Sequence, residues 1–124
     1  MSRKKLYEIL STVCKTDISQ KLKGNIKENT VVIERTSALA SMTNTISGWQ
    51  VWVIFIYCPY TPLKMDQLRK DIIKAVVLNN IEVMHEMREE YYDEEMLCYV
   101  SSVSCRMPST YYYRKEGENH GLQN

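Results

Sequence analysis

Glycine is scarce in this chain, with only four glycines among 124 residues. The phosphate-binding patterns G-x-G-x-x-G and G-x-x-x-x-G-K-[ST] are both absent, so no nucleotide-binding loop is expected. Histidine occurs twice, and His85 stands among glutamates without the three or four clustered ligands that a metal ion needs. The sequence therefore predicts no cofactor and no metal site.

Cysteine pairs of the C-x-x-C type are also missing. The four cysteines fall on or beside apolar stripes, which favours small buried side chains in a reducing compartment over disulfides or metal ligands. A catalytic thiol would need a nearby base and an electropositive pocket, and the adjacent acids at 93–95 are more typical of a solvated turn than of general acid–base catalysis. We expect no catalytic residues and no enzyme activity. The cysteines are Cys14, Cys58, Cys98 and Cys105.

Long hydrophobic runs are absent as well. The longest apolar run, Val51 to Cys58, is far too short to cross a bilayer. The start of the chain, Met1-Ser-Arg-Lys-Lys, lacks the apolar core of a signal peptide. The sequence thus predicts a soluble, cytoplasmic protein without a membrane partner.

The net charge of +1 hides an uneven distribution. Residues 1–30 hold seven basic side chains against three acids, whereas residues 82–95 hold seven acids against Arg88 alone. The two patches could be ordinary solvated faces. They could also pair head to tail between copies of the chain, because complementary charge steers association and fixes register.

Hydrophobic periodicity predicts two helices, three strands and one weak edge strand. Leu6, Ile9, Leu10 and Val13 form one helical stripe, and β-branched or alternating apolar residues mark the strands. Segment 37–48 has no clear period and is interpreted as an arm or a loop, and 88–95 as a solvated turn. The helices are expected at about 3–15 and 63–78, the strands at 30–36, 49–57 and 96–107, and the edge strand at 81–87.

The segment 49–57 is the strongest strand signal, and it is apolar on both faces. Trp49, Val51, Val53, Phe55 and Tyr57 alternate with Trp52, Ile54 and Ile56. A strand of this kind is covered on both sides. In so short a chain, we expect another subunit to supply the second cover.

The predicted fold is α+β, with a small antiparallel or mixed sheet of three to four strands and two helices packed on it. Residues 1–108 are expected to form one domain. Residues 109–124 have too little apolar content to pack, so a flexible polar tail is expected there.

With this order of elements, the chain resembles the small tail-terminator or head–tail joining proteins of long-tailed phages and of related phage-tail-like bacteriocins. Three stretches carry the resemblance. The first is a short N-terminal helix followed by a β-branched strand and a polar loop. The second is the apolar strand Gly48-Trp-Gln-Val-Trp-Val-Ile-Phe-Ile-Tyr-Cys-Pro-Tyr-Thr-Pro, which leads into Leu63-Lys-Met-Asp-Gln-Leu. The third is an acidic turn and a strand that closes with Arg-x-Pro, Tyr91-Tyr-Asp-Glu-Glu-Met-Leu-Cys-Tyr-Val-Ser-Ser-Val-Ser-Cys-Arg-Met-Pro. The resemblance lies in the order of the helices and strands and in the types of residue along them. It covers most of residues 5–108 and includes no diagnostic motif.

The resemblance implies a structural role in the virion. Such proteins form a ring, usually six-fold, at the head-proximal end of the tail, where the ring ends tube polymerisation and meets the head or neck connector. It implies a homo-oligomer, a tail-tube protein and a neck connector as partners, assembly in the host bacterial cytoplasm, and no catalytic residues. Tyrosine and arginine are frequent interface anchors. The residues expected at subunit or partner contacts are Met42, Trp49, Trp52, Ile54, Tyr111, Tyr112, Tyr113 and Arg114.

Two other functions stay open. The first is another neck or head-completion adaptor, which would do the same kind of work in a different ring. The second is a small regulatory nucleic-acid-binding protein, because basic residues near the start and the Tyr111-Tyr-Tyr-Arg-Lys segment mix charge with aromatic rings. The acidic patch and the absence of a known binding motif disfavour the second.

Overall fold

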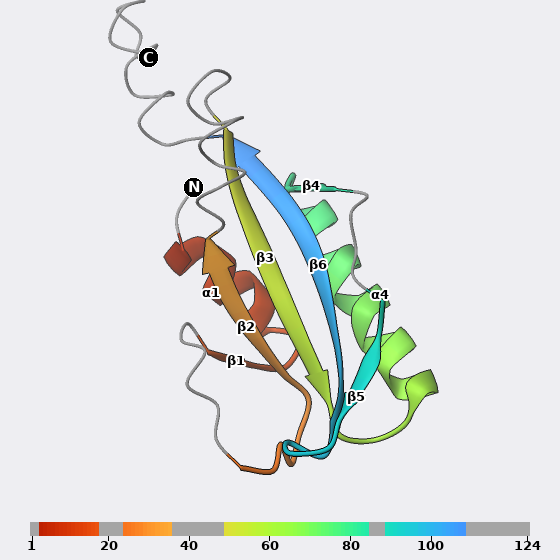
Figure 1. Cartoon of the computed structure of the whole chain (residues 1–124). Helices are drawn as coiled ribbons and strands as arrows, with labels where there is room; N and C mark the ends of the chain where they lie inside the picture. Colours follow the sequence, from red (N-terminus) through yellow and green to blue (C-terminus); the bar gives the residue numbers. More distant parts are fainter. Residues whose placement is uncertain (1–2, 18–23, 36–48, 85–88, 109–124) are drawn as a thin grey trace, which may run out of the picture.

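The structure is a computed structural model that describes residues 3–17, 24–35, 49–84 and 89–108 (Figure 1). Within them the chain forms two α-helices and a six-stranded mixed sheet, which confirms the predicted α+β class. The elements in chain order are α1 (Arg3–Ser11), β1 (Lys15–Asp17), β2 (Thr30–Arg35), β3 (Trp49–Cys58), α4 (Pro62–Leu78), β4 (Glu82–Val83), β5 (Tyr91–Asp93) and β6 (Cys98–Pro108).

The sheet has the order β1-β2-β3-β6, and β4 and β5 both pair with the outer side of β6. β1 runs parallel to β2, and every other pairing is antiparallel. The long central pair joins β3 to β6 from Trp49 opposite Pro108 to Cys58 opposite Tyr99. β1 therefore lies at one edge of the sheet, and β4 and β5 lie at the other (Figure 1).

The helix α1 is shorter than its apolar stripe predicts. The Ser11 hydroxyl donates to the Tyr7 carbonyl at 2.7 Å, and the Thr12 hydroxyl donates to the Ile9 carbonyl at 2.7 Å. Side-chain hydroxyls that bond the preceding turn compete with continued helix, so the helix ends at Ser11. Val13 and Cys14 then lie in the connection that leads into β1.

The helix α4 begins and ends where its sequence provides caps. Thr61 accepts a hydrogen bond from the Lys64 amide, and Pro62 occupies the first helical turn, where its missing N–H costs nothing. At the other end Asn80 adopts a left-handed backbone (φ 63°). The Ile81 amide there donates to the Val76 carbonyl at 3.0 Å, a left-handed helix stop that asparagine tolerates well.

Both helices pack on one face of the sheet. Leu6, Ile9 and Leu10 from α1 join apolar residues of α4 and of the central strands in one cluster. Every second residue of β3 points into it because side chains alternate along a strand. The buried members on the sheet and α4 include Val31, Ile33, Trp52, Ile54, Ile56, Met65, Leu68, Ile72, Val76, Val103 and Cys105.

The opposite face of the sheet carries a second, smaller cluster. Its buried members are Ile26, Val32, Tyr57, Cys98 and Val100, with Phe55 and Met96 partly buried beside them. No described helix packs on this face. Loop residues contribute instead, and the Ile26 amide donates to the Met96 carbonyl at 2.9 Å, which ties two connections together at one end of the sheet.

The sheet is larger than the three to four strands expected. β1 and β5 have three residues each, and their sequences, Lys-Thr-Asp and Tyr-Tyr-Asp, carry no hydrophobic alternation. β5 falls inside the segment predicted to be a solvated turn, so that prediction is wrong for 91–93. The weak edge strand is confirmed only as the two-residue β4. The arm at 37–48 and the tail at 109–124 lie outside the described residues.

Candidate protein-interaction surfaces

Two residues expected at a subunit interface lie instead in the core of the chain. Trp52 is 4% exposed and Ile54 is fully buried, and both face α1 and α4. The Arg3 guanidinium carbon lies 5.3 Å from the centre of the Trp52 ring, in cation–π geometry. α1 and α4 thus cover this face of β3, and the cover predicted from another subunit stays a prediction for the opposite face. A partner could reach these residues only by displacing α1 or α4.

The remaining expected contact residues are not placed by the structure. Trp49 is the first residue of β3, and its backbone pairs with Pro108, but its side chain lies outside the described residues. The other five also lie outside them. These are Met42, Tyr111, Tyr112, Tyr113 and Arg114.

A different surface stands out at the β5–β6 connection, which we call the acidic hairpin (residues 89–97). Its turn is built by Asp93, whose carboxylate accepts hydrogen bonds from the Glu95 and Met96 amides at 2.9 Å each. Leu97 closes the turn in a left-handed backbone conformation (φ 52°). Glu94 and Glu95 are exposed at the tip, and no ion pair within the described residues neutralises them.

The acidic hairpin also exposes large apolar groups. Tyr91 is 53%, Tyr92 47% and Leu97 46% exposed. Tyr92 is held in place by an edge-on contact with Tyr99, with ring centres 5.0 Å apart. Exposed tyrosines are frequent at surfaces that recognise other proteins, because the ring gives contact area and the hydroxyl can stay hydrated.

Arg69 of α4 fixes the start of the acidic hairpin to the helix-covered face. Its guanidinium donates to the Ser101 hydroxyl on β6 and lies 4.0 Å from the Glu90 carboxylate. At the other end of the same edge, Arg106 binds Glu82 of β4 through two hydrogen bonds of 3.0 and 3.2 Å. Glu82 and Glu90 thus have cationic partners, whereas Glu94 and Glu95 at the hairpin tip have none among the described residues.

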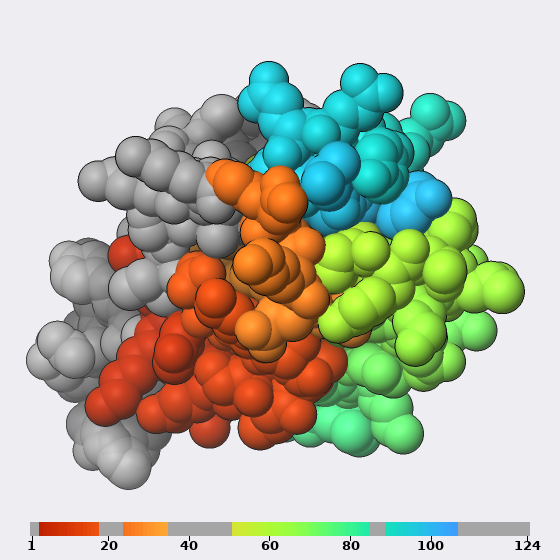
Figure 2. Space-filling view, turned by 90° about the horizontal axis from the view of Figure 1, so that it is seen from below, coloured from red at the N-terminus to blue at the C-terminus, as the bar shows by residue number. Residues whose placement is uncertain are grey.

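The opposite edge of the sheet is cationic. We call it the basic edge; it consists of the exposed side chains Arg3, Lys4 and Lys5 of α1 and Lys15 of β1. A depression of about 420 Å³ lies beside them and is lined by Arg3, Lys4, Tyr7, Thr16 and Asp17. Figure 2 shows α1 and β1 in red at the lower left and the acidic hairpin in cyan at the top, with the orange residues 24–35 between them.

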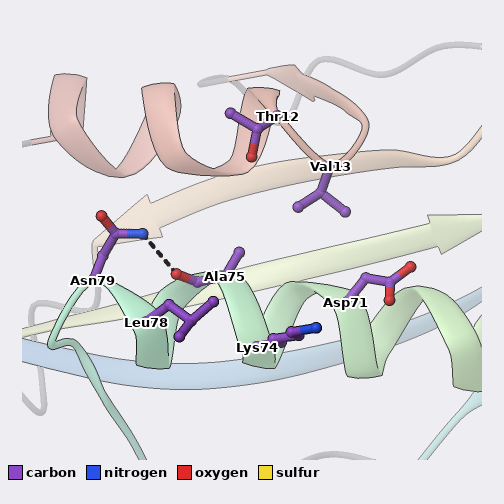
Figure 3. A pocket seen from close by; sticks show the side chains of 7 residues that line it. All are labelled: Thr12, Val13, Asp71, Lys74, Ala75, Leu78 and Asn79. Atoms are coloured by element: carbon purple, nitrogen blue, oxygen red, sulfur yellow. Dashed lines mark hydrogen bonds between the residues drawn. The ribbon is translucent and has the colours of Figure 1, made fainter.

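A second hollow lies between the end of α1 and the last turns of α4 (Figure 3). Asn79 is fixed there by donating to the Ala75 carbonyl at 2.8 Å. Asp71 and Lys74 bring opposite charges to the rim, and Leu78 is strongly exposed. The hollow lacks a concentration of one charge or a set of converging polar groups, so it offers little to hold a specific ligand.

The thiols of Cys14, Cys98 and Cys105 are suited to packing rather than to nucleophilic reactions. Burial raises the pKa of Cys14 and of Cys98 to about 11 and that of Cys105 to about 12, with smaller contributions from Glu28 on Cys14 and from Asp93 on Cys98. A thiol acts as a nucleophile in its ionised form. These groups are therefore protonated, weakly reactive side chains at neutral pH.

Among the residues that the structure describes, no three His, Cys, Asp or Glu side chains lie close enough together to hold a metal ion. None of the helices in these segments is both long and apolar enough to span a bilayer.

Neither a protein-family model nor a curated protein matches this sequence.

The acidic hairpin was only half visible in the sequence. The run of acids from 82 to 95 was clear, but Tyr91 and Tyr92 were not singled out. Two consecutive tyrosines directly before an acidic turn and an alternating strand are the signal that could have marked an exposed hairpin.

Proposed function

We propose that the protein is a structural assembly protein that forms a ring at the head-proximal end of a phage or phage-like tail. There it would end tube polymerisation and join the tail to the head or neck connector. The resemblance of sequence order and texture to tail-terminator proteins supplies the biological setting. The proposal places the protein in the virion neck, after assembly in the host bacterial cytoplasm.

The observation that carries the proposal is the acidic hairpin. Tyr91, Tyr92 and Leu97 are about half exposed beside a turn whose backbone amides donate to the Asp93 carboxylate. Exposed aromatic groups on a rigid support lose little conformational freedom on binding, so they are effective anchors for a protein partner. An assembly protein needs such surfaces, because subunit contacts are its whole activity.

The direct test combines the purified protein with tail-tube subunits from the same genome. Light scattering gives the mass of the protein alone, and electron microscopy gives the tube lengths with and without it. We expect a ring, alone or at the tube end, and shorter, capped tubes. A protein that neither associates nor changes tube length would contradict the proposal.

A pair of variants ties the test to the hairpin. Tyr91→Ser removes an exposed anchor from the acidic hairpin, whereas Val77→Ser removes an exposed apolar group from α4, away from it. We expect Tyr91→Ser to weaken assembly at least tenfold and Val77→Ser to leave it unchanged. Equal effects of the two changes would argue against the hairpin as the contact.

Nucleic-acid binding is the second candidate, and the basic edge is the observation that favours it. Arg3, Lys4 and Lys15 are exposed together, as in surfaces that contact phosphates. A DNA affinity that falls steeply with added salt would support this function. A salt-tolerant oligomer without DNA affinity would support the assembly function.

A further inference from the structure

We infer that the acidic hairpin of one copy docks on the basic edge of a second copy, so that subunits join head to tail. This inference rests on the proposed function and deepens it, since it names the two surfaces through which the copies would meet. The partner is therefore a second copy of this chain.

The first argument is that the acidic hairpin and the basic edge lie on opposite sides of the sheet. The acidic hairpin belongs to β5, and the basic edge belongs to β1 and α1, and these strands occupy the two opposite edges of the sheet (Figure 1). One contact between two copies would then use two different patches and leave one patch of each kind open. Such a heterologous contact repeats from copy to copy and closes into a ring when the rotation per subunit permits.

Charge complementarity is the second argument, and it is why a copy of this chain fits better than an unrelated partner. Glu94 and Glu95 at the hairpin tip lack an ion-pair partner within the described residues, and Lys4 and Lys15 of the basic edge form no ion pair there either. Bringing the surfaces together would pair each set with the opposite sign. Both surfaces repel their own kind, so a symmetric contact between two identical edges is disfavoured.

Open strand edges are the third argument. Among the described strands, β1 pairs only with β2, and β5 pairs only with β6, so each presents backbone donors and acceptors on its outer side. Sheet edges of this kind are ready sites for another chain. Tyr91 and Tyr92 lie on the β5 edge, and Tyr7 lies on α1 beside the basic edge, so apolar contact area accompanies the charges.

The test reverses the charge of each surface in a separate variant. One variant carries Glu94→Lys and Glu95→Lys, and the other carries Lys4→Glu and Lys15→Glu; Asp93 is kept because it builds the turn. Sedimentation velocity across a concentration series at low salt measures association. We expect the wild-type protein to associate, each variant alone to lose at least tenfold in affinity, and an equimolar mixture of the two variants to recover association.

A matched control changes the same number of charges elsewhere. Lys70→Glu with Lys74→Glu reverses two exposed lysines on α4, which belongs to neither surface. We expect this variant to associate like the wild type, and circular dichroism should show that every variant is folded. Added salt should weaken wild-type association, because exposed charges are screened over about 8–10 Å at physiological ionic strength.

The outcomes separate this inference from the proposed function. A wild-type protein that stays monomeric, or a variant mixture that fails to associate, overturns the head-to-tail contact, even if the protein still caps tubes. Recovery in the mixture supports the contact. If the recovered oligomer then fails to shorten tail tubes, the contact stands and the proposed place in the tail is overturned.

Discussion

The two faces of β3 are packed in different ways, although the strand is apolar on both. Trp52, Ile54 and Ile56 face α1 and α4 in the large cluster, where they are nearly or fully buried. Phe55 and Tyr57 face the other way, toward the smaller cluster that Ile26 and Met96 reach from loops. The first face is covered by two regular helices, and the second is covered, within the described residues, only by loop side chains.

The two faces differ in how much they contribute to the core. The helix-covered cluster contains more of the buried side chains, although Val32 and Cys98 of the smaller cluster are also fully buried. The acidic hairpin extends from the strands around the smaller cluster, since Cys98 and Val100 of that cluster follow its turn. Under the proposed function, changes at the exposed hairpin should alter contacts with partners more than they alter the fold.

The largest expected effect compares two neighbours on β3 that point to opposite faces. Ile54→Ala removes a fully buried side chain and should lower the free energy of unfolding by about 3–4 kcal/mol, because a cavity remains between the helices and the sheet. Phe55→Ala removes a partly buried ring and should cost about 1–2 kcal/mol. Urea unfolding followed by circular dichroism measures both, and equal losses would show that the two faces are equally important for stability.

Alkaline pH should affect the two clusters through their buried thiols. A thiol whose pKa is raised in the fold stabilises the protein fully below the ordinary value of 9.0, and this stability is lost as the pH rises toward the folded pKa. The loss should extend from pH 9 to about 12 for Cys105 and to about 11 for Cys98.

The matched variants are Cys105→Val in the large cluster and Cys98→Val in the smaller one. Both should move alkaline unfolding to higher pH, and Cys105→Val should move it further. Unfolding followed by tryptophan fluorescence between pH 8 and 12 measures the midpoints. A larger increase in the midpoint pH for Cys98→Val than for Cys105→Val would contradict this prediction.

The cap of α4 gives a smaller effect on the helix-covered face. Thr61→Ala removes the oxygen that accepts from the Lys64 amide, and it should lower the free energy of unfolding by about 1 kcal/mol. Thr61→Ser keeps the oxygen and is the control. If both variants lose the same stability, the threonine methyl group and not the cap is responsible.

The smallest expected effects are gains in the free energy of unfolding at two residues with a left-handed backbone. Leu97 lies in the acidic hairpin, and Asn80 lies at the end of α4. Leu97→Gly in the acidic hairpin should raise the free energy of unfolding by up to about 1 kcal/mol, because a leucine side chain crowds its own carbonyl there. Asn80→Gly at the end of α4 should gain only a few tenths of a kcal/mol, since asparagine tolerates this conformation. Thermal unfolding ranks the two, and a loss for Leu97→Gly would mean that its side chain packs more than its exposure indicates.

The sequence was sufficient for the long elements and for the fold class. The stripe of Leu6, Ile9 and Leu10, the caps around α4 and the alternation in 98–107 are each visible without coordinates, because a long periodic segment repeats its signal. β1 and β5 were missed because a three-residue strand has no period. They are strands because β2 and β6 offer unpaired edges, and that information lies far away along the chain.

The contact residues were harder to predict. Trp52 and Ile54 were assigned to an interface because periodicity shows which residues share a face of a strand but not what covers that face. α1 and α4 cover this face, and that depends on tertiary packing rather than on the sequence of the strand itself. The acidic patch was visible as composition, but its position opposite the basic edge depends on the strand order, which no local pattern contains.

The central pair of the sheet bears on how the chain reaches its fold. β3 and β6 are joined along their full lengths, yet their paired residues lie about 40–60 positions apart in the sequence. Contacts of such long range cost loop entropy before they stabilise anything, so folding times in milliseconds to seconds are expected rather than microseconds. On the ribosome, the edge of β3 that receives β6 stays open until the last strand has emerged. During that interval α1 and α4, which have already emerged, can shield Trp52 and Ile54, so their early packing on β3 would protect against aggregation during synthesis.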